Sequence, residues 1–341
     1  MQALSIDKPG HARIISIDPP TALPDDHVLL TIKTVGICGT DLSTYRGINP
    51  LVTYPRVPGH EIAAVIEKVG SEVPDTFAIG DTVTVYPYTH CGTCASCKNN
   101  RHHACEHNAT LGVQREGAFT EQITQPWEKL IPAKGLSFAE TALIEPMAVG
   151  FHAVERGRCT AQDTVVVLGC GAIGLGCIAG AHARGARIIA VDLDDHKLSV
   201  AQATGAAELI NAKKHALVEE VLNHTNGLGA DLIIEAVGSP ITFVAAIDAV
   251  SYTGRVVYIG YSKAHVTYDT ALFVKKELDI LGSRNATREN FQEVIAALRA
   301  GNIPIDKIIS RTVPLKEAPE ALDTWDKDGT DIVKIHVAIN E

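Results

Sequence analysis

The sequence has 341 residues, of which 46% are hydrophobic and 21% are charged, and its formal net charge is −10. This length exceeds one compact core and suits two domains, and the composition disfavours a disordered or a membrane protein. The acidic excess argues against nonspecific nucleic-acid binding, and no signal-peptide pattern is visible. Because the cysteines outside one close cluster show no pairing pattern, we expect a protein of the reducing cytoplasm.

The first 150 residues are rich in short apolar segments that Pro, Gly and Asp turns separate. The clearest segments are HVLLTIKTVGI, EIAAVIEKVG and DTVTVYP. This pattern is typical of a barrel-like or sandwich-like β domain. Four potential metal ligands lie at three widely separated places in this region: Cys38, the neighbours His60 and Glu61, and Glu145. Each has an ordinary structural explanation when it is taken singly, and spacing alone does not unite them.

A close cluster of cysteines follows in the same region, with the pattern C-x2-C-x2-C-x7-C. Its members are Cys91, Cys94, Cys97 and Cys105. Four thiolates so close in sequence can converge tetrahedrally on one Zn²⁺, and four protein ligands leave no open position for chemistry. A disulfide knot is the alternative, but evenly spaced cysteines in a long chain are more often metal ligands. The cluster therefore predicts a structural zinc site.

From Asp163 onward, strand-like segments alternate with helix-like ones. The strand-like segments are VVVLG, RIIAVD, DLIIEAVG and GRVVYIG, and helix-like segments such as IGLGCIAGAHARG and ITFVAAIDAVS separate them. This alternation predicts βαβ units and a parallel, doubly wound sheet. The uncharged stretch from Thr164 to Ala181 could pass for a membrane span, but glycines interrupt it and it begins with a β-branched strand pattern.

A glycine motif, G-x-G-x-x-G, links the strand VVVL to the apolar helix that follows. The motif consists of Gly169, Gly171 and Gly174, with Ala172 and Ile173 between the last two. In this context the glycines allow a tight turn, the close approach of a pyrophosphate and close helix packing. The next strand ends at Asp192, whose carboxylate can bind both ribose hydroxyls and would repel the 2′-phosphate of NADP. The motif predicts NAD binding, with a glycine-rich packing turn as the alternative.

Past residue 285 the alternation ends. NATRENFQEVIAALRAG predicts a helix opened by Thr287, and DIVKIHVAI predicts a closing strand. Arg284 precedes this helix, and Arg56 lies shortly before His60. An arginine can bind a carboxylate bidentately, so both residues are candidate contacts for an acidic substrate, and structural salt bridges are the alternative.

The motifs together resemble the zinc-containing medium-chain dehydrogenase/reductase superfamily along the whole chain. GICGTD, YPRVPGHE, the four-cysteine lobe, the IEP motif and VLGCGAIGLG occur in family order. Within the superfamily the chain is most similar to the polyol and sugar-acid branch, especially to L-galactonate 5-dehydrogenase-like proteins. GICGTD, YPRVPGHE and KKELDILGSRNAT carry that similarity. The implied α/β fold has a GroES-like domain over residues 1–150 and 286–341, with a Rossmann domain inserted over 151–285.

The resemblance also implies a second, catalytic zinc, so that two zinc ions per chain and NAD are expected. Its ligands carry over to Cys38, His60 and Glu61, and Glu145 is either a ligand or the partner of the metal's water. The sequence does not decide between those two roles.

Three further positions follow from the resemblance. Thr40 matches the family hydroxyl that takes the alcohol proton, and Lys197 matches a lysine that contacts the ribose. Ser43 stands where many relatives carry a histidine that passes the proton to solvent. Proton exit therefore runs through Thr40 and water, or through Glu145.

The implied activity is NAD-dependent oxidation of a secondary hydroxyl, with zinc as Lewis acid and hydride transfer to nicotinamide C4. An aldonate of the L-galactonate or L-gulonate type is favoured, and a sorbitol-type polyol or L-threonine is the alternative. A zinc-ribbon interaction module is the alternative from another class, and the net charge and the nucleotide motif weigh against it. The family is usually dimeric or tetrameric, so a homodimer or a homotetramer is expected.

Overall fold

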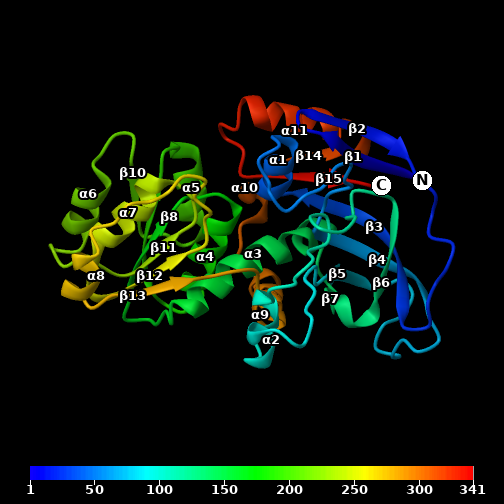
Figure 1. The fold of residues 1–341 in the computed structure, drawn as a ribbon, viewed down its shortest axis with the longest axis horizontal. Coiled ribbons are helices and arrows are strands. Elements are labelled where there is room, and N and C mark those ends of the chain that lie inside the picture. Colours follow the sequence, from blue (N-terminus) through cyan, green and yellow to red (C-terminus); the bar gives the residue numbers. More distant parts are fainter. Residues whose placement is uncertain (341) are drawn as a thin grey trace. The chain divides into compact units, whose positions relative to one another are not determined.

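The computed structural model describes residues 1–340 and divides into two compact units (Figure 1). The first unit holds Met1–Glu145 together with the chain from Ile309 onward, and the second unit is Pro146–Ile308. The limits therefore differ from those that the sequence predicts, chiefly because residues 286–308 pack within the second unit.

Helix α9 (Arg288–Arg299) accounts for the difference. Its buried face is apolar and consists of Phe291, Val294, Ile295 and Leu298. Asn290 at its first turn lies 3.0 Å from the ring of His152 and donates to Glu155 at 2.8 Å. Thr287 caps the helix, as the sequence predicts, by accepting from the Asn290 N–H at 3.3 Å.

The first unit is built mainly from antiparallel strands around an apolar core. The strands are β1 (Gln2–Lys8), β2 (His11–Ser16), β3 (His27–Ile37), β4 (Glu61–Val69), β5 (Thr82–Val85), β6 (Gln122–Pro126), β7 (Leu130–Pro132), β14 (Ile309–Pro314) and β15 (Lys334–Ala338). The helices are α1 (Gly39–Tyr45), α2 (Ala95–Lys98) and α11 (Ala318–Lys327), with 3-10 turns at His102–Ala104, Trp127–Lys129 and Leu315–Glu317. The main sheet has the order β14-β15-β3-β4-β5-β7, β6 also pairs with β3, and β1 pairs with β2. Helix α3 (Phe138–Arg156) crosses from the first unit into the second.

The main sheet of the first unit has two different faces, because successive side chains of a strand point to opposite sides. One face is buried in the apolar core and includes Val35, Ile37, Ile62, Ile335 and Val337. On β3, Gly36 is paired with Glu61 of β4 and with His336 of β15. These three residues therefore share the other face, where the polar side chains gather.

The second unit confirms the doubly wound parallel sheet that the sequence predicts. Its strands are β8 (Thr164–Leu168), β9 (Arg187–Asp192), β10 (Glu208–Asn211), β11 (Ala230–Glu235), β12 (Val250–Tyr258) and β13 (Asp279–Gly282), in the order β10-β9-β8-β11-β12-β13. Its further helices are α4 (Ala172–Ala183), α5 (Asp195–Thr204), α6 (Leu217–His224), α7 (Pro240–Ala249), α8 (Ala271–Lys275) and α10 (Ile305–Ile308).

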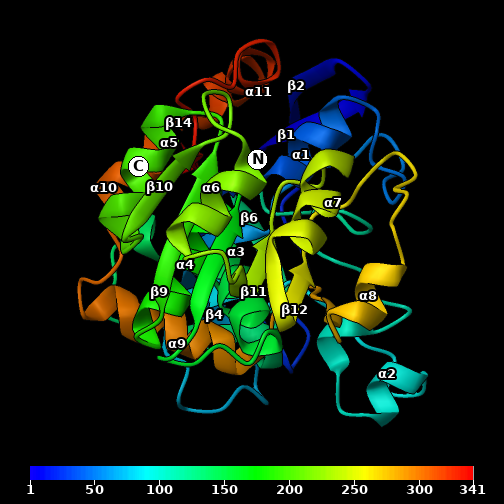
Figure 2. The ribbon, with the colours of Figure 1, turned by 90° about the vertical axis from the view of Figure 1, so that its left-hand side faces the viewer.

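Right-handed crossovers place α4 and α5 on one face of this sheet and α6 and α7 on the other. Figure 2 views the sheet with α6 and α7 in front of it. The uncharged stretch that resembles a membrane span forms β8 and α4. No helix in the described part of the chain is long and apolar enough to cross a membrane.

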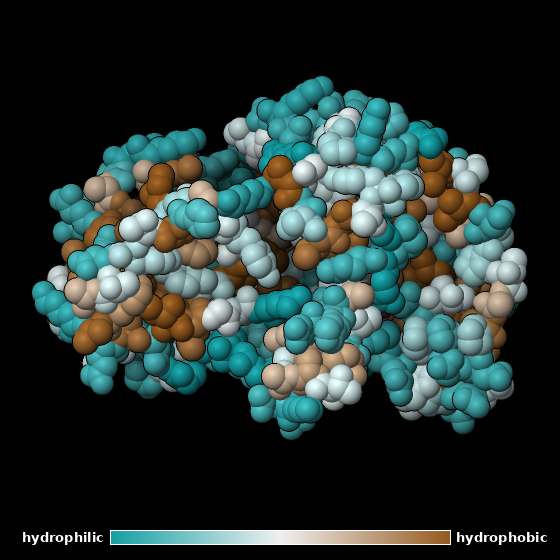
Figure 3. Space-filling view, in the orientation of Figure 1, coloured by the Kyte–Doolittle hydropathy of each residue, from teal (hydrophilic) through white to brown (hydrophobic). Residues whose placement is uncertain are grey.

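Hydrophobic residues also reach the surface of the second unit. Figure 3 shows them around α8 and β13. Val274 on α8 is 84% exposed, and Ile280 on β13 is 41% exposed. The parallel sheet thus ends in a short edge strand that is partly apolar.

Candidate metal centres and nucleotide turn

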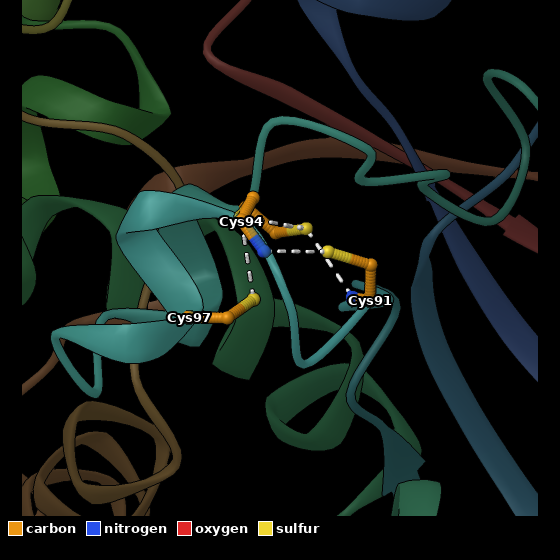
Figure 4. A group of neighbouring side chains, drawn as sticks. Cys91, Cys94 and Cys97 are labelled. Carbon is orange, nitrogen blue, oxygen red and sulfur yellow. Dashed lines mark hydrogen bonds between the residues drawn. The ribbon is translucent and has the colours of Figure 1, made fainter.

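The sulfur atoms of the four-cysteine cluster face a common centre. Figure 4 shows the thiols of Cys91, Cys94 and Cys97 turned toward one another. The Cys94 Sγ lies 3.5 Å from the Cys97 Sγ and 3.8 Å from the Cys105 Sγ. A tetrahedral zinc site with Zn–S bonds of about 2.3 Å separates its sulfurs by about 3.8 Å. All four cysteines are free thiols, so the geometry fits one zinc ion rather than a disulfide knot.

Backbone amides donate hydrogen bonds to the sulfur of Cys91 and so favour its metal-binding thiolate form. The N–H groups of Thr93 and Cys94 donate to the Cys91 Sγ at 3.4 and 3.3 Å. Hydrogen bonds from the Thr93 hydroxyl and from these two N–H groups lower the pKa of Cys91 to about 5. The thiolate is the form that binds metal, so the loop stabilises the ligand in its binding state.

A second group of donor atoms lies where β3 ends and β4 begins. Atoms of Cys38, His60 and Glu61 all lie within 4.8 Å of one another. The antiparallel pairing of β3 with β4 brings together these positions, which are distant in sequence. His60 is 5% exposed, and its Nδ1 atom has no hydrogen-bond partner among the described residues. A thiol, an imidazole and a carboxylate fit a zinc site with one open position.

Anionic groups surround this second centre. Burial lowers the pKa of His60, but Cys38, Asp41 and Glu145 outweigh that effect and raise it well above its usual value. Asp41 is 1% exposed and accepts a hydrogen bond from the Cys38 N–H at 2.8 Å. Burial raises the pKa of Asp41 to about 6, against the effect of nearby His60. The excess of negative charge suits a bound cation.

Glu145 lies near this centre on α3 and has a partner that the sequence did not predict. The Tyr88 hydroxyl donates to the Glu145 Oε1 at 2.5 Å, and both side chains are buried. Among the described residues, the close donor group contains Glu61 and not Glu145. The geometry therefore favours Glu61 as the third ligand and leaves Glu145 beside the centre.

Lys334 on β15 is another residue that sequence reasoning missed. Its ammonium group donates to both carboxylate oxygens of Glu61, at 2.6 and 2.7 Å. The lysine is a charged residue inside the apolar strand pattern DIVKIHVAI, and that interruption was the available signal.

The residues that the sequence predicts for proton transfer and substrate binding differ in their exposure and in their hydrogen-bond partners. Thr40 and Ser43 are partly exposed on α1. Arg56 is 9% exposed, and its guanidinium donates to Glu116 at 2.6 Å and to Thr53 at 3.0 Å. An ion pair of this kind is the alternative to a substrate contact at Arg56. Arg284 is partly buried in the second unit, directly after Ser283, which follows β13.

The glycine motif of the second unit forms the turn between β8 and α4. Gly169 has a φ of +94°, and a Cβ on Gly174 would lie 1.8 Å from the Gly169 carbonyl oxygen. A Cβ on Gly171 would meet nothing within 4 Å, which leaves the start of α4 open. Ala172 and Ile173 are partly exposed in the first turn of this helix. Backbone N–H groups at such a turn suit a pyrophosphate.

Asp192 ends β9 beside this turn and has a role that the motif alone did not show. Its Oδ2 atom accepts from the Cys170 N–H at 2.7 Å, and its Oδ1 atom accepts from the Leu193 N–H at 2.7 Å. The carboxylate therefore also ties the glycine turn to the neighbouring strand. Lys197 lies partly buried in the first turn of α5.

Known proteins resemble the chain in both units. Residues 24–135 match the family described as alcohol dehydrogenase GroES-like domain, and residues 172–300 match the family described as zinc-binding dehydrogenase. L-galactonate-5-dehydrogenase of Escherichia coli K12 is 33% identical over 304 residues, which cover 89% of this chain and 88% of that protein. Sorbitol dehydrogenase of Bacillus subtilis is 33% identical over 313 residues, with the same coverages of 89% and 88%.

A solved structure extends the similarity to the three-dimensional fold. The crystal structure of the alcohol dehydrogenase RspB of Escherichia coli CFT073, in complex with NADH, superposes with a TM-score of 0.91. The two sequences are 30% identical, and the match covers 99% of each chain.

Proposed function

The chain belongs to the zinc-type medium-chain alcohol dehydrogenase family, and we propose that it oxidises a secondary hydroxyl of a sugar acid or polyol with NAD. The resemblance that the motifs predict, including the GroES-like domain, is thereby confirmed. The observation that carries the proposal is the open donor set of Cys38, His60 and Glu61. Zinc bound there supplies a Lewis acid for the substrate oxygen, and NAD accepts the hydride.

The metal content provides the first test. We expect two zinc ions per chain, one at the four-cysteine cluster and one at the open donor set. Metal analysis of the purified protein measures this number directly. A single zinc per chain, with no NAD reduction by any polyol or sugar acid, would support the interaction-module alternative instead.

Proton transfer is proposed to use residues of α1 and α3. Thr40 accepts the proton of the substrate hydroxyl. Since Ser43 is not a histidine, the proton leaves through Thr40 and water or through Glu145, which the Tyr88 hydroxyl holds in place.

Cofactor choice is proposed to depend on Asp192, and Lys197 is proposed to contact the ribose. Asp192→Ala is expected to lower the preference for NAD over NADP in kcat/KM by about tenfold or more, because ribose hydrogen bonds are lost and 2′-phosphate repulsion is relieved. Asp195→Ala is the matched control, because Asp195 is an exposed carboxylate that pairs with Lys214. A wild-type enzyme that prefers NADP would contradict this assignment.

The substrate is proposed to be an aldonate such as L-galactonate. The two similar dehydrogenases do not decide the point, since the sugar-acid enzyme and the polyol enzyme are each 33% identical. Arg56 and Arg284 are the candidates for the carboxylate contact, and Arg56 also donates to Glu116. A charge-assisted hydrogen bond contributes about 1.5–3 kcal/mol, or roughly ten- to more than a hundredfold in kcat/KM.

The test compares kcat/KM for L-galactonate and galactitol in the wild type, Arg284→Ala and Arg56→Ala. We expect the acid to be preferred, and replacement of an arginine that binds its carboxylate to remove that preference. A wild type that prefers the polyol would indicate a sorbitol-type enzyme, and turnover of L-threonine alone would indicate a threonine dehydrogenase.

The protein is further proposed to form a homodimer or a homotetramer in the cytoplasm. Light scattering of the purified protein measures the number of subunits.

A further inference from the structure

Lys334 is a buried cation in the sheet that carries the open metal centre. The residue is 2% exposed, and its ammonium group makes three hydrogen bonds. Two go to Glu61, at 2.6 Å to Oε1 and 2.7 Å to Oε2, and the third goes to the Ile37 carbonyl oxygen at 3.1 Å. An ammonium has three N–H donors, so every donor of this group is used. A buried cation with full hydrogen bonding has a defined position.

The three bonds connect the two segments that carry the other ligands. Ile37 directly precedes Cys38, and Glu61 directly follows His60. β15 pairs with β3 at Ile335 and Ile37, and β3 pairs with β4 at Gly36 and Glu61. One ammonium therefore joins the end of β3 to the start of β4 at the level of the metal ligands.

Gly36 makes this arrangement possible. A Cβ at Gly36 would lie 2.0 Å from the Glu61 Oε2 atom, which is closer than any real contact. The Glu61 side chain thus crosses β3 through the space that a larger residue would fill. Its carboxylate is 0% exposed and reaches Lys334 on the far side of that strand.

The same carboxylate keeps capacity for a metal. Two carboxylate oxygens offer about four lone-pair sites, and the lysine uses two of them. The positive charge of Lys334 also offsets the buried anionic groups Asp41, Glu61 and Glu145, which lie around the centre. The lysine and a metal ion can therefore hold Glu61 from different sides.

We propose that Lys334 is a positioning residue of the open metal centre, which fixes Glu61 in the orientation that ligates zinc. The inference rests on the proposed function, because it takes Cys38, His60 and Glu61 as the zinc site. It makes β15 part of the centre, although no residue of β15 is a metal ligand. The effect of Lys334 passes through Glu61, and this sets it apart from a lysine that merely stabilises the sheet.

The test measures zinc affinity at the open centre by competition with a chromogenic chelator, using full-length protein. The variants are Lys334→Met, Lys334→Arg, Glu61→Gln and the double variant Lys334→Met/Glu61→Gln. Lys68→Met is the matched control, because Lys68 is an exposed lysine on β4 of the same sheet. Zinc at the four-cysteine cluster serves as an internal reference in every variant.

We expect Lys334→Met to bind zinc at the open centre at least tenfold more weakly, with the four-cysteine zinc retained. The double variant should match Glu61→Gln alone, since Lys334 has no effect without its partner carboxylate. Wild-type affinity in Lys334→Met, or a further loss in the double variant, overturns the proposal.

If Lys334→Met does not fold, Lys334→Arg tests whether Lys334 positions Glu61 for zinc binding. The arginine keeps the charge but cannot reproduce the three ammonium contacts, so zinc should bind at least threefold more weakly. A variant that loses only thermal stability and keeps wild-type zinc affinity assigns Lys334 a structural role and overturns the proposal. If the wild type itself binds zinc only at the cysteines, the proposed function fails, and the inference falls with it.

Discussion

The two candidate metal centres of the first unit are assembled in opposite ways. The four-cysteine cluster draws all its ligands from one loop, in which Cys91 and Cys105 are 14 positions apart. The open centre draws on β3 and β4, and Glu61 is held by a lysine 273 positions away. The first centre is thus a property of a chain segment, and the second is a property of a folded sheet.

This difference predicts how the two centres respond to damage. At a closed site the metal-binding energy is folding energy, because the loop has little else to hold it. At the open centre, the core of the sheet already holds the ligands in place. The fold therefore does not depend on the metal, whose role there is catalytic in the proposed function. Variants of the two centres should therefore separate stability from activity.

His60→Ala is expected to have the largest effect, and on activity alone. Loss of one of three ligands should lower kcat/KM by about a thousandfold or more, which corresponds to roughly 4 kcal/mol. The thermal midpoint should change by less than about 3 °C, since the core of the sheet, and not the metal, holds these ligands in place. His27→Ala, at a partly exposed histidine of β3, is the control. If His60→Ala retained activity, the open centre would not be catalytic.

Cys94→Ser is expected to act on stability. Loss of a structural metal costs roughly 4 kcal/mol, which lowers the thermal midpoint by about 8–16 °C. Zinc content should fall by one ion per chain. The matched control is Cys159→Ser, because Cys159 is a buried cysteine outside both centres. Equal stability of the two variants would show that zinc at the four-cysteine cluster does not stabilise the fold.

Gly36→Ala is expected to weaken the open centre by sterics alone. The added Cβ overlaps the Glu61 carboxylate and should displace it, so zinc binding there should weaken by about tenfold, near 1.4 kcal/mol. Gly282→Ala is the control, because a Cβ at that strand glycine would meet nothing within 4 Å. Chelator competition measures both variants. Unchanged zinc affinity in Gly36→Ala would show that Glu61 is not a ligand.

Tyr88→Phe is expected to have the smallest effect. The variant keeps the ring, which packs edge-on against Tyr86 at 5.0 Å, and removes the bond to Glu145. One hydrogen bond contributes about 1 kcal/mol, so kcat should fall about fivefold with zinc affinity retained. Tyr45→Phe removes a hydroxyl that bonds to Asp323 away from the centre, and its kcat should not change. Equal kcat values in both variants would exclude a role for Tyr88 in turnover.

The sequence predicted those parts of the structure that depend on local pattern. The glycine turn, the four-cysteine loop and the Thr287 helix cap each lie within a few residues, where spacing translates directly into geometry. The alternating segments likewise predicted the parallel sheet. Helix α3 was not predicted, and neither was β13, which lies inside a stretch used only for its family resemblance.

The rest depended on contacts between distant strands. Pairing of β15 with β3, and of β3 with β4, decides that Lys334 meets Glu61, and no spacing rule contains that information. Tyr88 and Glu145 meet for the same reason. Arg56 had the chemistry of a carboxylate contact, but its partner Glu116 is 60 positions away and was not apparent from the sequence. The packing of α9 within the second unit also depends on distant contacts, and the change of pattern near residue 285 does not indicate it.

The bond between Lys334 and Glu61 also has a consequence for the order of biosynthesis. At about 5–20 residues per second, a ribosome needs roughly 14–55 s to add the 273 residues that separate the two partners. The 14 positions between Cys91 and Cys105 take roughly 1–3 s at the same speed. During translation the nascent chain can therefore load the zinc of the cysteine loop long before β15 exists. The open centre is complete only after the strand that carries Lys334 has been made, so it can bind its own zinc in the complete site only from that time.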